Sequence, residues 1–176
     1  IPGLDEDLKT RFLAESLFIR AHYFYHLVQQ FGDIPMPLKP TNSVETTAHK
    51  TKVDEVWNQI VTDLEFAVEN LPETYQASEF GHITKYAAMH HLSRVYLTLK
   101  RSDDDLKKAL NYAEQVINSG KYSLVKSHAE LWDINNKNNS EVLFSVLYTQ
   151  NAELNGDGNT AHMYFCSAYS EEHPAV

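Results

Sequence analysis

Apolar residues recur every three to four positions in four stretches of the chain, and this spacing predicts four α-helices. The first stretch carries two neighbouring apolar rows, which makes a stripe wide enough to be buried on much of the helix circumference. Gly32, Pro72 and Gly120 directly follow three of the stretches and are expected to end those helices. The rows are Leu13, Leu17, Phe24, Val28 and Phe31, with Ala14, Phe18, Ala21 and Tyr25 beside them; Val56, Ile60, Leu64, Ala67 and Leu71; Ala88, Leu92, Val95, Tyr96 and Leu99; and Leu106, Ala109, Leu110, Ala113, Val116 and Ile117.

The predicted helices cover residues up to 31, then 53–71, 84–99 and 103–119, and their lengths suggest paired helices. The third and fourth together span roughly 35 residues, close to the period of a tetratricopeptide repeat, or TPR. We expect these two helices to pack antiparallel, with Ala88 and the segment Ala109–Ala113 at their contact. The first and second would form a preceding pair, stretched by a proline-containing loop. The pattern therefore predicts a mainly α fold of TPR-like antiparallel helix pairs joined by irregular loops.

After Gly120 the sequence changes in character. The segment Glu141–Tyr148 is β-branched and aromatic, which predicts a short strand near the C-terminus, although a lone strand needs partners. Residues 1–126 carry 14 basic and 17 acidic side chains, whereas residues 127–176 carry one basic and seven acidic ones. We therefore predict a helical scaffold over residues 1–126 and a loop-rich polar and aromatic segment over 127–176 of the same incomplete domain.

Composition excludes several classes of protein. Of the 176 residues, 43% are hydrophobic and 22% are charged, which is typical of globular chains rather than disordered ones. The net charge of −9 argues against a nucleic-acid partner, because nucleic-acid binders normally carry a basic stripe. No unbroken apolar run exceeds four residues, so no segment is expected to span a bilayer. The single cysteine, Cys166, excludes an intrachain disulfide and the usual cysteine pair of a zinc site.

Histidines and carboxylates are the candidate catalytic or metal-binding groups of the sequence. His22 and His26 lie four positions apart on one helix, but no glutamate follows His22 and no third ligand is evident. The adjacent His90 and His91 point to different helix faces. The acidic residues of the second helix are expected on its solvated polar side, where they do not form the paired carboxylates of a glycosidase; they are Asp54, Glu55, Asp63 and Glu65. We therefore expect no enzymatic activity, no metal and no cofactor.

The C-terminal segment is the best candidate for ligand binding, because seven asparagines lie there among aromatic residues. The apolar C–H face of a sugar ring packs on tryptophan or tyrosine, and its hydroxyls pair with the donors and acceptors of asparagine. Trp132 is the first candidate platform and Tyr164 the second, with Asn135 and Asn159 as polar partners. The alternative is that the asparagines populate loops and the aromatic residues pack in the core.

A series of motifs extends over nearly the whole chain. The motifs are Arg11–Tyr25 (RFLAESLFIRAHYFY), Gln30–Leu38 (QFGDIPMPL), Val53–Glu65 (VDEVWNQIVTDLE) with Leu71-Pro72, Gly81–Ala88 with Arg94–Leu97, Ala109–Gly120 followed by Lys121–Leu124, Asn138–Ser145 and Gly156–His162. In this order they resemble the SusD/RagB family. Complete members of that family are longer, so we expect the chain to be an internal fragment.

The resemblance implies a function that the residues alone do not give. SusD-like proteins are non-catalytic outer-membrane lipoproteins of Bacteroidetes, built on TPR-like helix pairs. They bind oligosaccharides at the cell surface and cover a SusC-like TonB-dependent transporter. The resemblance thus implies an oligosaccharide ligand, that transporter as partner, and a lipid-anchored location on the outer membrane. A TPR-type protein-protein interaction scaffold is the alternative function.

Overall fold

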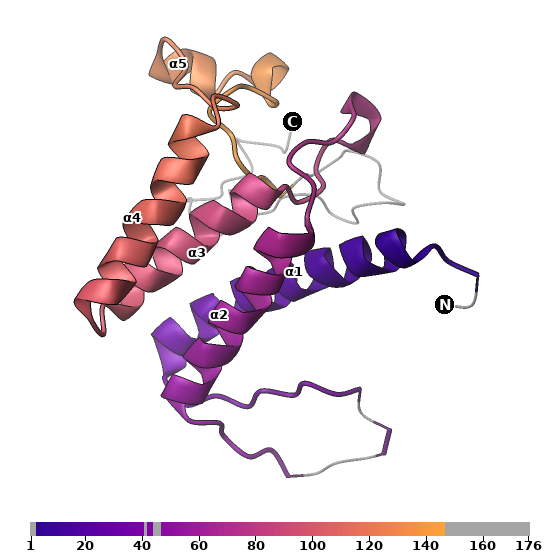
Figure 1. Cartoon of the computed structure of the whole chain (residues 1–176), viewed down its shortest axis with the longest axis vertical. Helices are drawn as coiled ribbons and strands as arrows, with labels where there is room; N and C mark the ends of the chain where they lie inside the picture. Colours follow the sequence, from indigo (N-terminus) through magenta and orange to yellow (C-terminus); the bar gives the residue numbers. More distant parts are fainter. Residues whose placement is uncertain (1–2, 41, 44–46, 147–176) are drawn as a thin grey trace, which may run out of the picture. The chain divides into compact units, whose positions relative to one another are not determined.

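The computed structural model describes residues 3–40, 42–43 and 47–146, and the first of its two compact units is Ile1–Phe144. The described part is mainly helical, as predicted (Figure 1). The division of the chain at residue 126 stays a prediction. The α-helices are α1 (Glu6–Phe31), α2 (Val53–Asn70), α3 (Lys85–Leu99), α4 (Asp103–Asn118) and α5 (His128–Leu131), and the 3₁₀ turns are η1 (Ala77–Glu79) and η2 (Ile134–Asn136).

The strand predicted near the C-terminus is wrong where the structure describes it. Residues 141–146 form a turn, a bend and irregular backbone, and residues 147–148 lie outside the described part. Extended pairing within the described ranges is limited to an isolated antiparallel bridge between Ile34 and Thr51. A β-prone segment stays irregular when no partner strand satisfies its backbone groups. Within the same ranges, no helix has the length and apolar character needed to cross a membrane.

Short polar residues and glycine set the helix ends. Asp5, Thr84 and Ser102 precede α1, α3 and α4, and their side-chain oxygens accept hydrogen bonds from backbone N–H groups of the first turn. Gly32 ends α1 with φ at +67°, a left-handed conformation that favours glycine. These local signals explain why the predicted helix limits agree with the structure.

Helices α1 and α2 form the first antiparallel pair. The Arg20 guanidinium on α1 donates two hydrogen bonds of 2.7 Å to the Asp63 carboxylate on α2. Beyond the end of α1, Ile34 forms an antiparallel bridge with Thr51, just before α2. As the residue number rises on one side it falls on the other, which defines the antiparallel direction.

The prediction that all the acidic residues of α2 lie on its solvated side is wrong for Asp63. Its side chain is 2% exposed, and Gln59 donates a third hydrogen bond of 2.7 Å to it. A buried carboxylate is tolerated when a cation and further donors satisfy its oxygens. Asp63 is therefore part of the contact between α1 and α2, and not a solvated group.

Helices α3 and α4 form the second antiparallel pair, because the short connection over residues 100–102 reverses the direction of the chain between them (Figure 1). The Ser93 hydroxyl on α3 donates to the Ala109 carbonyl oxygen on α4 at 2.7 Å, and the rings of Tyr96 and Tyr112 stack with centroids 6.2 Å apart. Ala109 is buried at the contact, as predicted, and Ala88 is also buried. Helix α3 also packs on α2, because the Tyr96 hydroxyl donates to the Glu65 carboxylate at 2.9 Å.

The core lies between α1, α2 and α3, with a smaller contribution from α4. On α1 the second predicted apolar row is buried, whereas Leu13 and Phe31 of the first row are exposed. Leu110 and Ile117, predicted on the apolar face of α4, are exposed as well, and Leu110 is 59% exposed. The apolar stripes of α1 and α4 are wider than the surfaces that the neighbouring helices cover.

Candidate functional site

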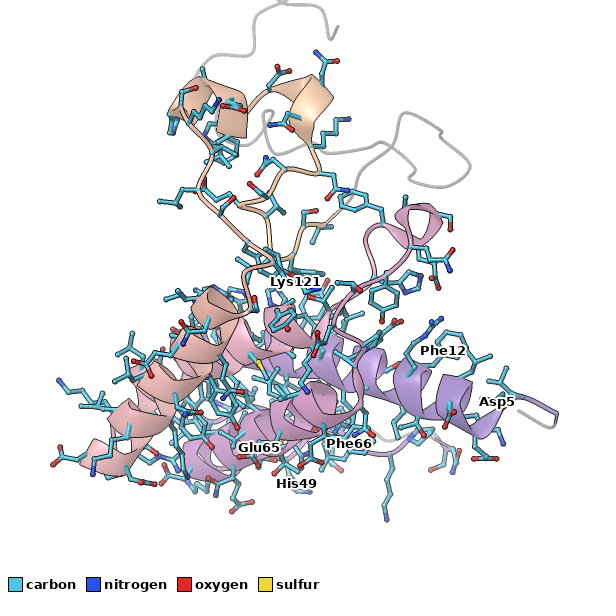
Figure 2. All side chains as sticks on the ribbon, turned by 45° about the horizontal axis from the view of Figure 1, so that its top comes forward. Asp5, Phe12, His49, Glu65, Phe66 and Lys121 are labelled. Carbon is cyan, nitrogen blue, oxygen red and sulfur yellow. The ribbon has the colours of Figure 1, made fainter. Side chains whose placement is uncertain are left out.

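The chain that leaves α4 forms a closed loop over residues 121–143, which we call the Trp132 loop (Figure 2, where Lys121 marks its start). At its base the Tyr122 ring meets the Tyr86 ring of α3 edge to face, with centroids 5.9 Å apart. The Ser123 backbone N–H donates to the Ser140 carbonyl oxygen at 3.0 Å, and the two hydroxyls are also 3.0 Å apart. The two ends of the loop are therefore joined to each other and to the helical scaffold.

The interior of the Trp132 loop is held by the buried side chain of Asn139. Its Nδ2 donates to the carbonyl oxygens of Asn136 at 3.0 Å and Leu131 at 3.5 Å, and its Oδ1 accepts from the Glu141 N–H at 3.0 Å. Asparagine satisfies irregular backbone in this way because it carries both donors and an acceptor. One asparagine thus fixes the loop around the short helix α5.

Trp132 follows α5 directly, and its side chain is 72% exposed. Its indole N–H donates to Nε2 of His128 at 3.0 Å, with the two ring centroids 6.0 Å apart. The structure thus presents a large aromatic surface to solvent in a defined orientation. Such a surface is suited to packing against the C–H face of a sugar ring.

Asn135 lies in the same loop and is exposed. Its backbone N–H and its Nδ2 both donate to Oδ1 of Asp133, at 2.8 and 3.1 Å. The side-chain oxygen of Asn135 remains an acceptor for a ligand hydroxyl. Trp132 and Asn135 therefore lie in the same loop, each bonded to another residue of it, whereas Tyr164 and Asn159 lie outside the described residues.

A second polar and aromatic cluster joins α1 to the segment over residues 72–84. One oxygen of Glu15 accepts hydrogen bonds of 2.9 Å from the Tyr75 hydroxyl and from Nδ1 of His82. The ring of His82 stacks on Tyr75 with centroids 5.2 Å apart, and the Arg11 guanidinium lies 5.5 Å from the Tyr75 centroid. Burial raises the pKa of Tyr75, and the bond to Glu15 adds to the rise. The Tyr75 ring is thus engaged in holding the segment to α1.

Three histidines form a third cluster between α1 and α3. The ring centroids of His22 and His26 are 4.8 Å apart, and those of His22 and His91 are 5.4 Å apart. His91 is 5% exposed, and its Nε2 has no hydrogen-bond partner in the described part of the chain. Burial lowers the pKa of His91 to about 3, and that of His22 is lowered for the same main reason. His90 is exposed, on a different face from His91, as predicted.

Sequence reasoning missed the roles of His91, Asn139 and His128, because each depends on neighbours that spacing does not reveal. Only the four-residue spacing of His128 and Trp132 offered a signal, since such residues share one side of a helix. Among the residues that the structure describes, no group of three or more His, Cys, Asp or Glu side chains is arranged to hold a metal ion. The chemistry that the described sites offer is aromatic packing and hydrogen bonding.

The comparison with protein families decides the affiliation of this chain. A SusD-like family model, described as "Starch-binding associating with outer membrane", matches residues 4–97, which include α1, α2 and most of α3. The chain belongs to this SusD-like family.

Solved and curated relatives agree with the family. The chain is 26% identical over 145 residues to SusD-like protein P25 of Formosa agariphila, which covers 82% of this chain and 27% of that protein. It superposes on a laminarin-binding SusD-like protein with a TM-score of 0.74 and 29% identity, over 84% of this chain and 32% of the other. It superposes on a protein solved with a xylogluco-oligosaccharide with a TM-score of 0.77 and 26% identity, over 83% and 31%.

The chain therefore spans about a quarter to a third of the length of the relatives that it matches. The mainly α, TPR-like fold is shared with these proteins. Laminarin binding is stated in the name of one of these relatives, and another was solved with a xylogluco-oligosaccharide.

Proposed function

We propose that this chain is part of a non-catalytic glycan-binding protein at the outer-membrane surface, which captures an oligosaccharide and passes it to a SusC-like TonB-dependent transporter. The observation that carries the proposal is the family membership, together with the likeness to a laminarin-binding protein and to a protein solved with a xylogluco-oligosaccharide. The family description supports the location, because it names association with the outer membrane.

Trp132 is the proposed sugar platform of this chain. Its exposed indole is held at the edge of a loop whose backbone is already ordered by Asn139. An ordered platform loses less conformational freedom on binding than a mobile one, which favours affinity. Asn135 is the proposed polar partner, and Tyr164 and Asn159 remain proposed further contacts.

Two carboxylates of α2, Asp63 and Glu65, support binding without bond cleavage. Glycoside hydrolysis needs two carboxyl groups on either side of the scissile bond. The Asp63 carboxylate is occupied by Arg20 and Gln59, and the Glu65 carboxylate accepts the Tyr96 hydroxyl. Both groups therefore serve contacts between the helices.

The proposal is tested by replacing Trp132 with alanine in the whole protein and measuring affinity by calorimetry for oligosaccharides of laminarin and xyloglucan. A stacked aromatic contact contributes about 1 kcal/mol beyond its buried area, so we expect Kd to rise about fivefold or more. Tyr23→Ala is the matched control, because Tyr23 is 64% exposed on α1 and lies outside the loop. The control should keep the affinity of the unmodified protein.

Two results would contradict the proposal. If the Trp132→Ala protein stays folded and binds every glycan with unchanged affinity, this loop does not provide the sugar platform. Glycan binding that is absent from the unmodified protein, together with capture of a peptide, would favour the alternative of a TPR-type protein-interaction scaffold.

A further inference from the structure

The hydrogen bond between Trp132 and His128 specifies the protonation state of the imidazole. The indole nitrogen carries a hydrogen and can only donate, so Nε2 of His128 at 3.0 Å must present its lone pair. The hydrogen of the ring therefore lies on Nδ1, and the ring is neutral. A protonated imidazole carries N–H on both nitrogens, so that two N–H groups would face each other across the contact.

We propose that His128 is a positioning residue that holds the exposed indole of Trp132 ready for a sugar ring, and that it does so only while its imidazole is neutral. The inference rests on the proposed function of the Trp132 loop and adds its regulation. Glycan capture at this loop should accordingly weaken in acid and recover when the medium returns to neutral pH.

The energetic argument concerns the freedom of an exposed side chain. An indole that is 72% exposed has few neighbours to select one rotamer, so a fixed orientation needs a specific bond. The bond to His128 supplies it, because His128 and Trp132 are four residues apart on the same side of α5 and its C-terminal cap. Without that bond the indole is free to change rotamer, and it loses this conformational entropy only when the sugar binds. The affinity for the sugar is therefore lower.

Four charged side chains lie near His128 in the sequence. The acidic groups nearest in sequence are Glu130 on α5 and Asp133 after it, and Asp133 already accepts two N–H groups of Asn135. Lys126 precedes α5 and Lys137 follows η2. The ion pairs of the described residues do not include His128. Histidine side chains typically change charge between about pH 5 and 8.

The role of His128 is tested without a glycan by nuclear magnetic resonance of the whole protein labelled with ¹⁵N-tryptophan. The indole N–H signal of Trp132 is identified by its loss in Trp132→Phe. We expect this signal to move in one titration between about pH 8 and 5. In His128→Gln the amide oxygen accepts the indole N–H, so the signal should stay in its bonded position at every pH. In His128→Ala it should lie at the position of an unbonded indole at every pH.

Affinity for laminarin oligosaccharide gives the second measurement. From pH 8 to pH 5 the unmodified protein should weaken about twofold to tenfold, as expected for ordering one large side chain during binding. His128→Ala should show the weaker affinity at both values, and His128→Gln should rescue it and remove the pH dependence. His49→Gln, an exposed histidine before α2, is the control and should behave as the unmodified protein.

The outcomes separate this inference from the proposed function. If the position of the indole N–H signal changes neither with pH nor on substitution of His128, the positioning role is overturned. This holds even if Trp132→Ala abolishes binding. A titrating indole signal with unchanged affinity in Trp132→Ala would overturn the proposed function of the loop, and with it the regulation of glycan capture. An indole titration that persists in His128→Gln would assign the change to another group and would also overturn the inference.

Discussion

At the scale of single residues, two leucines of the second helix pair behave in opposite ways. Leu92 on α3 is fully buried, whereas Leu110 on α4 is 59% exposed. Both lie on predicted apolar stripes, and periodicity gives no means to tell them apart. The difference arises because the buried face of α4 carries Ala109 and Val116, and Leu110 lies beside that face rather than on it.

These two positions give a direct test of the packing. Replacing Leu92 by alanine should lower the free energy of unfolding by about 2–5 kcal/mol, because it removes buried methyl groups and leaves a cavity. Replacing Leu110 by alanine should change it by less than about 0.5 kcal/mol, as is usual at exposed positions. Urea denaturation measures both. A larger loss at Leu110 than at Leu92 would show that α4 is rotated relative to the structure.

Asp63 shows what the sequence could not reveal at this scale. Its position on the polar side of α2 predicted a solvated carboxylate, but Arg20, 43 residues earlier, pairs with it. A long-range pair of this kind leaves no periodic signal. The sequence also left the exposure of Trp132 open, because an aromatic residue in this segment could serve a ligand or pack in the core, and the structure shows it exposed.

At the scale of elements, the sequence predicted the four long helices well, whereas the strand predicted from residue 141 onward is wrong over residues 141–146. Helix limits depend on local features, such as the Ser102 side chain before α4 or Gly32 after α1, and these can be read from the chain. The predicted strand depended on a partner, and the segment over residues 141–146 has none among the described residues. The Trp132 loop depends on bonds such as that of Asn139 to Leu131, which no short-range rule predicts.

The Trp132 loop should therefore respond as one unit to the loss of Asn139. Alanine at this position leaves the carbonyl oxygens of Leu131 and Asn136 without their side-chain donor. We expect faster amide hydrogen exchange over residues 128–142, with little change in α1 to α3, because loops of this kind open locally. Asn138→Ala, at the exposed neighbouring position, is the matched control. Equal protection in both variants would mean that other contacts hold the loop.

At the scale of the described scaffold, the antiparallel packing of α1, α2 and α3 creates environments that no single helix contains. The histidine cluster is the clearest example, because His22 on α1 meets His91 on α3 only after the fold forms. Sequence spacing places the two histidine pairs on separate helices and shows no third ligand for either pair. The fold buries His91 against the Phe18 ring and the Tyr25 ring, with centroids 5.6 and 5.0 Å away.

This burial couples the stability of the scaffold to pH. Desolvation lowers the pKa of His91 from the ordinary 6.5 to about 3, and the nearby charges of His22 and Arg94 add to the effect. Between these values the unfolded chain binds a proton that the folded chain does not, so stability falls as the pH falls. One such proton corresponds to about 1.4 kcal/mol per pH unit.

Replacing His91 by phenylalanine should remove that contribution, because phenylalanine fits among aromatic rings and the Nε2 atom has no hydrogen-bond partner among the described residues to lose. Between about pH 5.5 and 4.5 the unmodified protein should lose about 1.4 kcal/mol more than the variant in urea denaturation. Part of the acid sensitivity should remain, because the pKa of His22 and that of His90 are also lowered. His49→Phe, at an exposed position, should keep the full slope. Parallel slopes for His91→Phe and the unmodified protein would show that His91 takes up its proton in the folded state, and would place it in a more solvated environment than the packing of α1 against α3 provides.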